Sequence, residues 1–438
     1  MPTRLASRQW KNWAGNQRAT PAAIETPSSE EEIVAIVRDA AAAGERVKMV
    51  GAGHSFTAIA VTDGRLIRPD NSQRVLSVDR AKRLVTVQAG IKLSTLNAEL
   101  AKRGLAMPNL GDIEYQSIAG AISTATHGTG IKLGGLATFV VGMRIITGDG
   151  SVIECDAEHE PELFHTARVG LGALGVLSTV TLQCEEAFNV HAVESAAKVD
   201  ELLDSLDDHI AENDHFEFFW IPNTEWALTK WNNRTEKPLA PRSRWKEFRD
   251  DVLIGNGGFS LGCRIARLAP SLTPRIMGLV PFTGRAEYID RSDKVYTSPR
   301  LVHFYEMEYS IERSACREAL NRVRQFVSQS GIQISFPVEV RFTAGDDIPL
   351  STAYGRENCY IAVHVYSGTH YQQYFEAVET IMNDYGGRPH WGKLHFQTHR
   401  TLRDRYPEWE RFQAVRKRLD PEGRFSNPYL ERVLGPLH

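Results

Sequence analysis

Apolar residues recur along the first 185 residues with the periods of short helices and short strands. The run from Ser29 to Gly44 predicts an amphipathic helix, because Ser29 and Glu32 can form a capping box and Gly44 can end the helix. A second amphipathic helix is expected over 92–103, and a helix of small residues over 117–126. β-rich runs predict strands at 46–50, 74–79, 83–88, 140–147, 151–155 and 177–183.

The pattern changes after about residue 185, where the strands become more aromatic and the helices longer. Strands are expected at 215–220, 333–342 and 359–366, and amphipathic helices at 312–330 and 371–385. This combination predicts an antiparallel sheet with helices on one face, which is a second α+β domain. The end of the chain contains one more predicted helix, at 409–419.

Length and composition fit a two-domain globular protein. The chain has 438 residues, more than one hydrophobic core usually supports, with 42% hydrophobic and 24% charged residues. A net charge of −3 and the lack of a long basic run argue against nucleic acid or an anionic membrane as partner. No segment approaches the roughly 20 apolar residues of a membrane span, and the N-terminus has no apolar signal region. We therefore expect a cytoplasmic protein.

The cysteines point to neither a disulfide framework nor a metal site. They are odd in number, scattered and without a CxxC pair: Cys155, Cys184, Cys263, Cys316 and Cys359. Buried thiols in a reducing compartment fit this distribution better, and no metal is expected.

The most informative motif is a glycine turn that follows the predicted strand at 46–50. It reads Val50-Gly51-Ala52-Gly53-His54-Ser55-Phe56. Such a turn exposes successive backbone N–H groups to an anion and lets a diphosphate approach the main chain. A phosphate loop needs no imidazole, whereas a covalently anchored flavin does. The heptad alone leaves open an ordinary glycine-rich turn with a solvated histidine.

A second glycine motif, 170–175, matches the GxGxxG fingerprint of dinucleotide-binding folds. That fingerprint requires a strand before it and a helix after it. Here a helical segment, 161–168, precedes it, and the β-branched strand at 177–183 follows. We therefore interpret it as a helix-to-strand turn packed near a cofactor.

Three further motifs accompany the glycine turn in order along the chain. They are Gly111-Asp112 with the small-residue stretch 117–130, Glu339-Val340-Arg341, and His390-Trp391-Gly392-Lys393-Leu394-His395. Together these motifs resemble the vanillyl-alcohol-oxidase-type FAD enzymes, and within them the sugar-1,4-lactone oxidase branch. Bacterial alditol oxidases are close relatives of that branch. The resemblance covers nearly the whole chain.

The resemblance implies an α+β fold with a two-subdomain FAD-binding domain of the PCMH type over 1–185. A substrate or cap domain with an antiparallel sheet would cover 186–400, and the segment 401–438 would return to the FAD domain. The residues expected to bind FAD are Val50, Gly51, Ala52, Gly53, His54, Ser55, Phe56, Gly111, Asp112, Ser117, Gly120, Thr124, Thr126, His127 and Val176. His54 matches the position that, in many relatives, bonds the flavin covalently.

The resemblance also implies the catalytic residues. Glu339 would be the general base, and Arg341 and Lys393 would stabilise developing negative charge. Glu339 and Arg341 project to the same face of a strand, but the same sequence pattern also fits a simple salt bridge at the end of a strand. The neighbouring cations are expected to keep Glu339 ionised. Substrate contacts are expected from Asp112, His364, Tyr366 and His390.

The implied reaction oxidises the C2 hydroxyl of an aldono-1,4-lactone, such as L-gulono-1,4-lactone, to a ketone that yields an ascorbate-type product. Gly111 leaves a path for oxygen, which favours O2 as acceptor. Tyr366, where alditol oxidases carry threonine, favours a ring-shaped substrate. The alternatives are an alditol or aldose oxidase of the same fold, a lactone dehydrogenase with another acceptor, and a flavin-binding protein without turnover.

Overall fold

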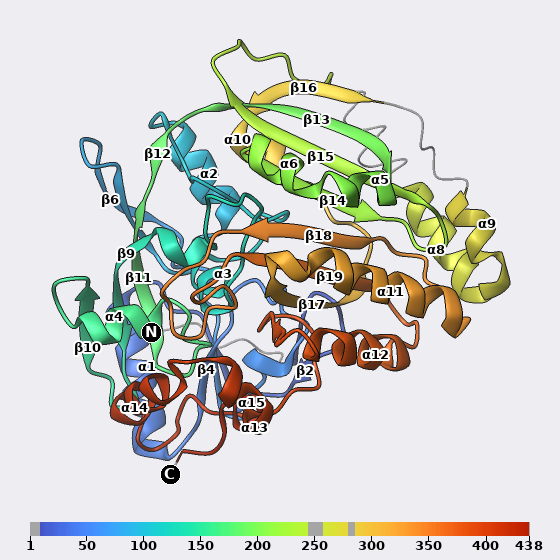
Figure 1. The fold of residues 1–438 in the computed structure, drawn as a ribbon. Coiled ribbons are helices and arrows are strands. Elements are labelled where there is room, and N and C mark those ends of the chain that lie inside the picture. Colours follow the sequence, from blue (N-terminus) through green and yellow to red (C-terminus); the bar gives the residue numbers. More distant parts are fainter. Residues whose placement is uncertain (1–8, 244–256, 279–284, 438) are drawn as a thin grey trace.

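A computed structural model describes residues 9–243, 257–278 and 285–437 (Figure 1). In the described chain, the N-terminal half carries a three-stranded parallel sheet, β3-β5-β4, and a five-stranded antiparallel sheet, β10-β9-β11-β7-β6. The strands are β1 Trp10–Lys11, β2 Arg18–Ala19, β3 Ala23–Glu25, β4 Val47–Met49, β5 Arg65–Ile67, β6 Val75–Asp79, β7 Leu84–Gln88, β8 Leu105–Ala106, β9 Val140–Ile146, β10 Val152–Asp156, β11 Val176–Gln183 and β12 Glu185–Glu186. The helices are α1 Glu30–Ala43, α2 Leu93–Ala101, α3 Ile118–Ser123 and α4 Pro161–Ala167.

The predicted elements of this half are confirmed, with one change in the first helix cap. The Oγ of Ser29 accepts the Glu32 N–H, and Gly44 ends α1 in the left-handed conformation, with φ 67°. The Glu32 carboxylate, however, accepts the N–H of Ser28 at 2.8 Å, so the reciprocal bond of the capping box is displaced by one residue. The 170–175 motif lies between α4 and β11, which confirms a helix-to-strand turn.

The second half of the chain forms, among the described residues, an eight-stranded sheet of order β16-β13-β15-β14-β18-β19-β17-β20. Its strands are β13 Asn189–Lys198, β14 His215–Trp220, β15 Trp226–Thr235, β16 Ala286–Arg291, β17 Phe304–Glu312, β18 Val338–Thr343, β19 Asn358–Tyr366 and β20 Arg388–Pro389. The helices are α5 Val199–Asp204, α6 Leu206–Glu212, α8 Phe259–Leu268, α9 Thr273–Gly278, α10 Ser292–Tyr296, α11 Cys316–Ser330 and α12 Gln372–Asn383. All the pairings in this sheet are antiparallel, as predicted.

Two predicted bounds in this half are wrong. The strand expected from residue 333 begins only at Val338, because 331–337 is irregular. The helix expected from residue 312 begins at Cys316, because Glu312 completes β17. The strands β13, β15, β16, β17 and β20 were not predicted.

The eight-stranded sheet has one apolar and one polar face. Alternate residues such as Phe218, Val340 and Met307 are fully buried in a core that also contains α5, α6, α11 and α12. These helices lie along one side of the sheet (Figure 1). The residues between them along the strands, which are mostly polar, therefore point toward the N-terminal half.

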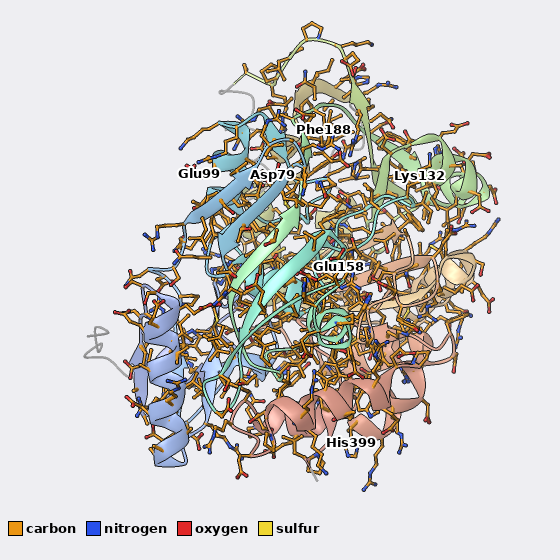
Figure 2. The ribbon with its side chains drawn as sticks, turned by 90° about the vertical axis from the view of Figure 1, so that its left-hand side faces the viewer. Asp79, Glu99, Lys132, Glu158, Phe188 and His399 are labelled. Atoms are coloured by element: carbon orange, nitrogen blue, oxygen red, sulfur yellow. The ribbon has the colours of Figure 1, made fainter. Side chains whose placement is uncertain are left out.

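The C-terminal helices pack against the N-terminal half. They are α13 His399–Leu402, α14 Trp409–Leu419 and α15 Pro428–Leu434, and their apolar residues belong to the same core as β7, β9 and α4. In Figure 2 they lie at the base of the molecule, where His399 is labelled. The bounds 1–185, 186–400 and 401–438 remain a prediction, and the packing departs from them at Ile348, Leu350 and Trp391, which join this core.

All five cysteines lie in the described part of the chain and are buried free thiols. Among the described residues, no helix combines the length and the apolar character needed to cross a bilayer.

Candidate active site

The glycine turn lies against the start of α3. A Cβ atom on Gly51 would stand 2.1 Å from the Oγ of Ser117. Ser117 caps α3, because its Oγ accepts the Gly120 N–H at 3.2 Å. Within the described residues, the backbone N–H groups of residues 51–55 donate no hydrogen bond. Free N–H groups in a turn beside a helix start fit the diphosphate of FAD.

The other residues expected to bind FAD lie at the end of α3, around Gly111 and beneath α1. Thr124 ends α3 and donates to the Gly120 carbonyl at 3.2 Å, and Thr126 accepts from the Gln116 amide at 3.2 Å. A Cβ atom on Gly111 would lie 3.1 Å from the His127 carbonyl oxygen, so these two segments are in close contact. Val176 is buried in a small core beneath α1.

The side chain of His54 is held by aromatic neighbours that the sequence analysis did not identify. Its ring stacks on Trp13 at 5.4 Å and on Tyr115 at 6.2 Å. The backbone N–H of Trp13 donates to the Gly53 carbonyl at 2.8 Å, so the N-terminal segment also fixes the turn. Burial, together with Lys393 and His303, lowers the pKa of His54 to about 4. The imidazole is therefore neutral at pH 7 and keeps a lone pair for bond formation.

The segment around Trp391 is hydrogen-bonded to the glycine turn. The Phe56 N–H donates to the Gly392 carbonyl at 2.7 Å, and the Thr57 hydroxyl donates to the Trp391 carbonyl at 3.2 Å. Lys393 follows directly, and its Nζ lies 5.4 Å from the centre of the Phe56 ring. These bonds place Lys393 next to the predicted cofactor loop, although more than 300 residues separate them in sequence.

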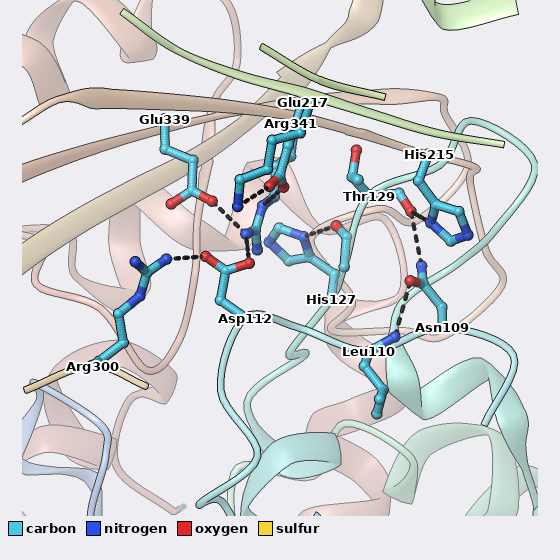
Figure 3. A network of polar contacts seen from close by, with 12 residues as sticks. Asn109, Leu110, Asp112, His127, Thr129, His215, Glu217, Arg300, Glu339 and Arg341 are labelled. Carbon is cyan, nitrogen blue, oxygen red and sulfur yellow. Dashed lines mark hydrogen bonds and ion pairs between the residues drawn. The ribbon is translucent and has the colours of Figure 1, made fainter. Parts of the chain in front are cut away.

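Glu339 and Arg341 lie together on the polar face of the sheet, as predicted. The guanidinium of Arg341 is 2.5 Å from the Glu339 carboxylate and 2.8 Å from that of Glu217, and it also pairs with Asp112 (Figure 3). Lys230 lies 3.3 Å from the second oxygen of Glu217. Arg341 therefore connects the N-terminal half, through Asp112, to two strands of the sheet.

The expectation that nearby cations keep Glu339 ionised is wrong. Burial raises the pKa of Glu339, and Asp112 and Glu217 raise it further, whereas Arg341 and His364 lower it. The balance brings the pKa of Glu339 to about 7. A carboxyl group with this pKa is well matched to proton abstraction near neutral pH.

His364 stands between Glu339 and a carboxylate that the sequence analysis missed, Glu306. The Nδ1 of His364 lies 3.0 Å from the Pro337 carbonyl, and its Nε2 lies 3.5 Å from Glu306 and 3.9 Å from Glu339. Burial opposes the charge on His364, but Glu306 raises the pKa of the imidazole above its ordinary value. Glu306 also forms an ion pair with Lys393. Burial would raise the pKa of Glu306, yet Lys393 and His364 bring it to about 2.

A second missed carboxylate, Glu308, holds the predicted residue His127. The His127 Nε2 lies 3.2 Å from Glu308, and the His127 ring stacks on Tyr360 at 3.6 Å. His390 is buried nearby, and its Nδ1 accepts the Gly392 N–H at 3.0 Å. Burial lowers the pKa of His390 to about 3, which keeps it neutral.

Among the residues that the structure describes, three groups of acidic residues and histidines lie close enough together to hold a cation. In two of these groups a cationic side chain of the protein, Arg341 or Lys393, already pairs with the carboxylates, and in the third the Nε2 of His127 lies 3.2 Å from the Glu308 carboxylate. A metal ion is therefore not required to stabilise them.

Tyr366 lies two residues beyond His364 on β19. Its hydroxyl accepts a hydrogen bond from Arg264 of α8 at 3.2 Å. Its ring packs with Phe304 and Phe336. Its role in substrate binding remains a prediction.

Replacing Gly51 by alanine is expected to reduce FAD content and to destabilise the protein by about 1–3 kcal/mol, because the new methyl group would overlap Ser117. The measurements are the ratio of flavin to protein absorbance and the thermal melting temperature. Gly142→Ala is the matched control, since its Cβ would make only ordinary contacts, at 3.7 Å. Equal flavin content in both variants would contradict the assignment of the turn.

Comparison with known proteins agrees with this geometry. A family model described as FAD binding domain matches residues 21–156, and one described as D-arabinono-1,4-lactone oxidase matches 180–433. An L-gulono-1,4-lactone dehydrogenase of Mycobacterium tuberculosis is 48% identical, over 98% of this chain and 99% of the relative. An L-gulonolactone oxidase of Bos taurus is 37% identical, over 97% and 98%.

Among solved structures, a cholesterol oxidase from B. sterolicum has a TM-score of 0.81 at 17% identity and covers 100% of this chain and 97% of that one. This likeness concerns the fold alone, and it confirms the predicted class of an FAD-binding domain combined with an α+β domain built on an antiparallel sheet. The chain belongs to the D-arabinono-1,4-lactone oxidase family and is an FAD-dependent oxidoreductase acting on CH–OH groups.

Proposed function

We propose that this enzyme oxidises the C2 hydroxyl of an aldono-1,4-lactone of the L-gulono-1,4-lactone type to the ketone, which gives an ascorbate-type product. The observation that carries the proposal is the position of Glu339. Its carboxylate has a pKa of about 7 and lies between Arg341 and His364, on the polar face of the sheet. Relatives named for L-gulonolactone and D-arabinono-1,4-lactone support the substrate class.

In this proposal each side chain has one task. Glu339 removes the proton of the substrate hydroxyl, and bound FAD supplies the hydride acceptor. Arg341 and Lys393 stabilise the negative charge that develops on oxygen. Burial would lower the pKa of Lys393, but Glu306 and Glu308 raise it, so Lys393 remains a cation. Glu306 thus raises the pKa of both Lys393 and His364.

We propose O2 as the electron acceptor, with hydrogen peroxide as product, and the cytoplasm as location. Gly111, which the resemblance associates with oxygen access, supports O2 as the acceptor. The names of the relatives include both an oxidase and a dehydrogenase, so the acceptor must be measured. The buried free thiols support a reducing compartment.

The test of this function is anaerobic mixing of the purified holoenzyme with L-gulono-1,4-lactone, xylitol or L-gulose while flavin absorbance is followed. The lactone is expected to bleach the flavin fastest, and admission of O2 should restore the colour with one hydrogen peroxide per turnover. Bleaching by xylitol alone would contradict the substrate class. Bleaching that O2 does not reverse would indicate another acceptor.

We also propose that FAD is linked covalently to His54. Acid precipitation of the unmodified enzyme is expected to give a yellow pellet, and His54→Ala a yellow supernatant, because the variant lacks the nucleophilic nitrogen. His303→Ala is the control, since His303 stacks on the same Trp13 ring at 4.6 Å and should leave the pellet yellow. Release of all flavin from the unmodified enzyme would contradict the link.

A further inference from the structure

Arg300 lies beside the catalytic carboxylates, on the loop between α10 and β17. The Ser298 N–H of this loop donates to the Asp112 backbone carbonyl at 2.9 Å. The Arg300 guanidinium pairs with the Asp112 carboxylate (Figure 3). Two contacts to one residue of the N-terminal half therefore fix this loop at the edge of the site.

Arg300 and Arg341 use their donors differently. The Arg341 guanidinium faces three carboxylates, and its side chain is 8% exposed. The Arg300 side chain is 36% exposed and pairs with Asp112 through Nη2. Within the described residues, the Nε and Nη1 of Arg300 donate no hydrogen bond. Arg300 thus has donors left for a ligand, whereas Arg341 has its carboxylate partners within the protein.

The Arg300 guanidinium and the Glu339 carboxylate lie near each other, on one side of Asp112 (Figure 3). Their charges interact, since Glu339 contributes to raising the pKa of Arg300. A guanidinium only donates hydrogen bonds and matches planar oxygen acceptors, whereas a carboxylate accepts from a hydroxyl. An α-hydroxy carbonyl compound presents both complementary groups on adjacent carbon atoms.

We propose that Arg300 determines substrate specificity by donating hydrogen bonds to the carbonyl oxygen of an α-hydroxy lactone, while Glu339 accepts the proton of the adjacent hydroxyl. This inference rests on the proposed function and extends it. A polyol presents only hydroxyl oxygens, which match the planar guanidinium less well than a carbonyl oxygen, so it gains less from Arg300. The carboxylate of an open-chain aldonate is a stronger partner for a guanidinium, so an aldonate binds at the same place as a competitive inhibitor.

Kinetics of the holoenzyme test the discrimination between substrates. Arg300→Met is expected to raise KM for L-gulono-1,4-lactone by about 10- to 100-fold, the effect of one charged hydrogen bond, and to leave KM for xylitol within about twofold. Asp112 keeps Arg341 as partner in this variant, so the fold is retained. The KM of Arg300→Lys for the lactone should lie between that of the unmodified enzyme and that of Arg300→Met, because lysine keeps the charge but lacks the planar guanidinium. Arg322→Met, which removes an exposed pair with Asp384, is the control and should behave like the unmodified enzyme.

Calorimetric titration with L-gulonate provides a measurement that needs no turnover. Arg300→Met is expected to weaken L-gulonate binding by at least about tenfold, and Arg322→Met to leave it unchanged. Equal losses with lactone and xylitol, or unaltered L-gulonate binding, would overturn the role of Arg300. An unmodified enzyme that binds L-gulonate through Arg300 but does not oxidise the lactone would refute the proposed function and not the binding role. Failure of the unmodified enzyme to bind L-gulonate would refute the aldonate site.

Discussion

Replacing Glu339 by glutamine is expected to lower the rate constant of anaerobic flavin reduction by about 10²- to 10⁴-fold, because the amide has no basic oxygen for the substrate proton. In the unmodified enzyme the same rate constant should rise with pH and level off above about pH 7. The direction of this pH dependence follows from the pKa of Glu339, which burial raises to about 7. The ionised carboxylate, which is the reactive form, therefore increases as the pH passes that value. Stopped-flow absorbance between pH 5.5 and 9 measures both effects.

The control for this variant is Glu357→Gln, which removes an exposed carboxylate paired with Arg313 at 2.9 Å. It should leave the rate constant and its pH dependence unchanged. A Glu339→Gln enzyme that reduces its flavin at the normal rate would disprove the assigned base. A normal rate that keeps its pH dependence would point to His364 as the base, since its Nε2 lies 3.9 Å from Glu339.

Replacing Arg341 by methionine is expected to lower the free energy of unfolding by about 3–5 kcal/mol, because it leaves buried carboxylates without their shared cation. The loss should lie toward the lower end of that range. Asp112 keeps its ion pair with Arg300, and Glu217 keeps Lys230 at 3.3 Å, so Glu339 is the carboxylate that loses most of its ion-pair stabilisation. Urea unfolding followed by tryptophan fluorescence measures the change. Flavin reduction should also slow, since Arg341 is the cation nearest to the proposed base.

Arg317→Met is the matched control for Arg341→Met, since it breaks an ion pair with Asp204 in which both side chains are more than half exposed. Solvent screens such a pair, so the expected loss is at most about 1 kcal/mol. Equal losses in the two variants would mean that the buried network contributes no more than a surface ion pair.

The sequence was sufficient to predict features that depend on neighbouring residues. The cap at Ser29, the glycine stop of α1 and the helix-to-strand turn at 170–175 depend on backbone geometry within a few residues. The common face of Glu339 and Arg341 follows from the two-residue period of a strand. The order of the motifs was enough to identify the FAD-binding fold.

The strand β17 was missed for a physical reason. It reads Phe-Tyr-Glu-Met-Glu-Tyr-Ser-Ile-Glu, and its alternating glutamates look solvent-exposed. In the structure Glu306 and Glu308 are buried, because Lys393 pairs with Glu306 and the imidazole of His127 contacts Glu308, both from distant parts of the chain. The alternation itself was the signal that could have revealed the strand. Glu217 on β14, which pairs with Arg341, and Lys230 on β15, which pairs with Glu217, gave no comparable signal.

The amino-acid sequence by itself determined the local elements, the glycine turn predicted to bind phosphate and the identity of the side chains proposed to react, since each depends on residue types at short spacing. Only the tertiary structure decided the charge of those side chains. Glu339 has one cation two residues away along the strand, but Asp112 and Glu217 reach it from other elements, and burial removes the solvent that would stabilise its ionised form. The proton affinity of the proposed base is therefore a property of the folded molecule.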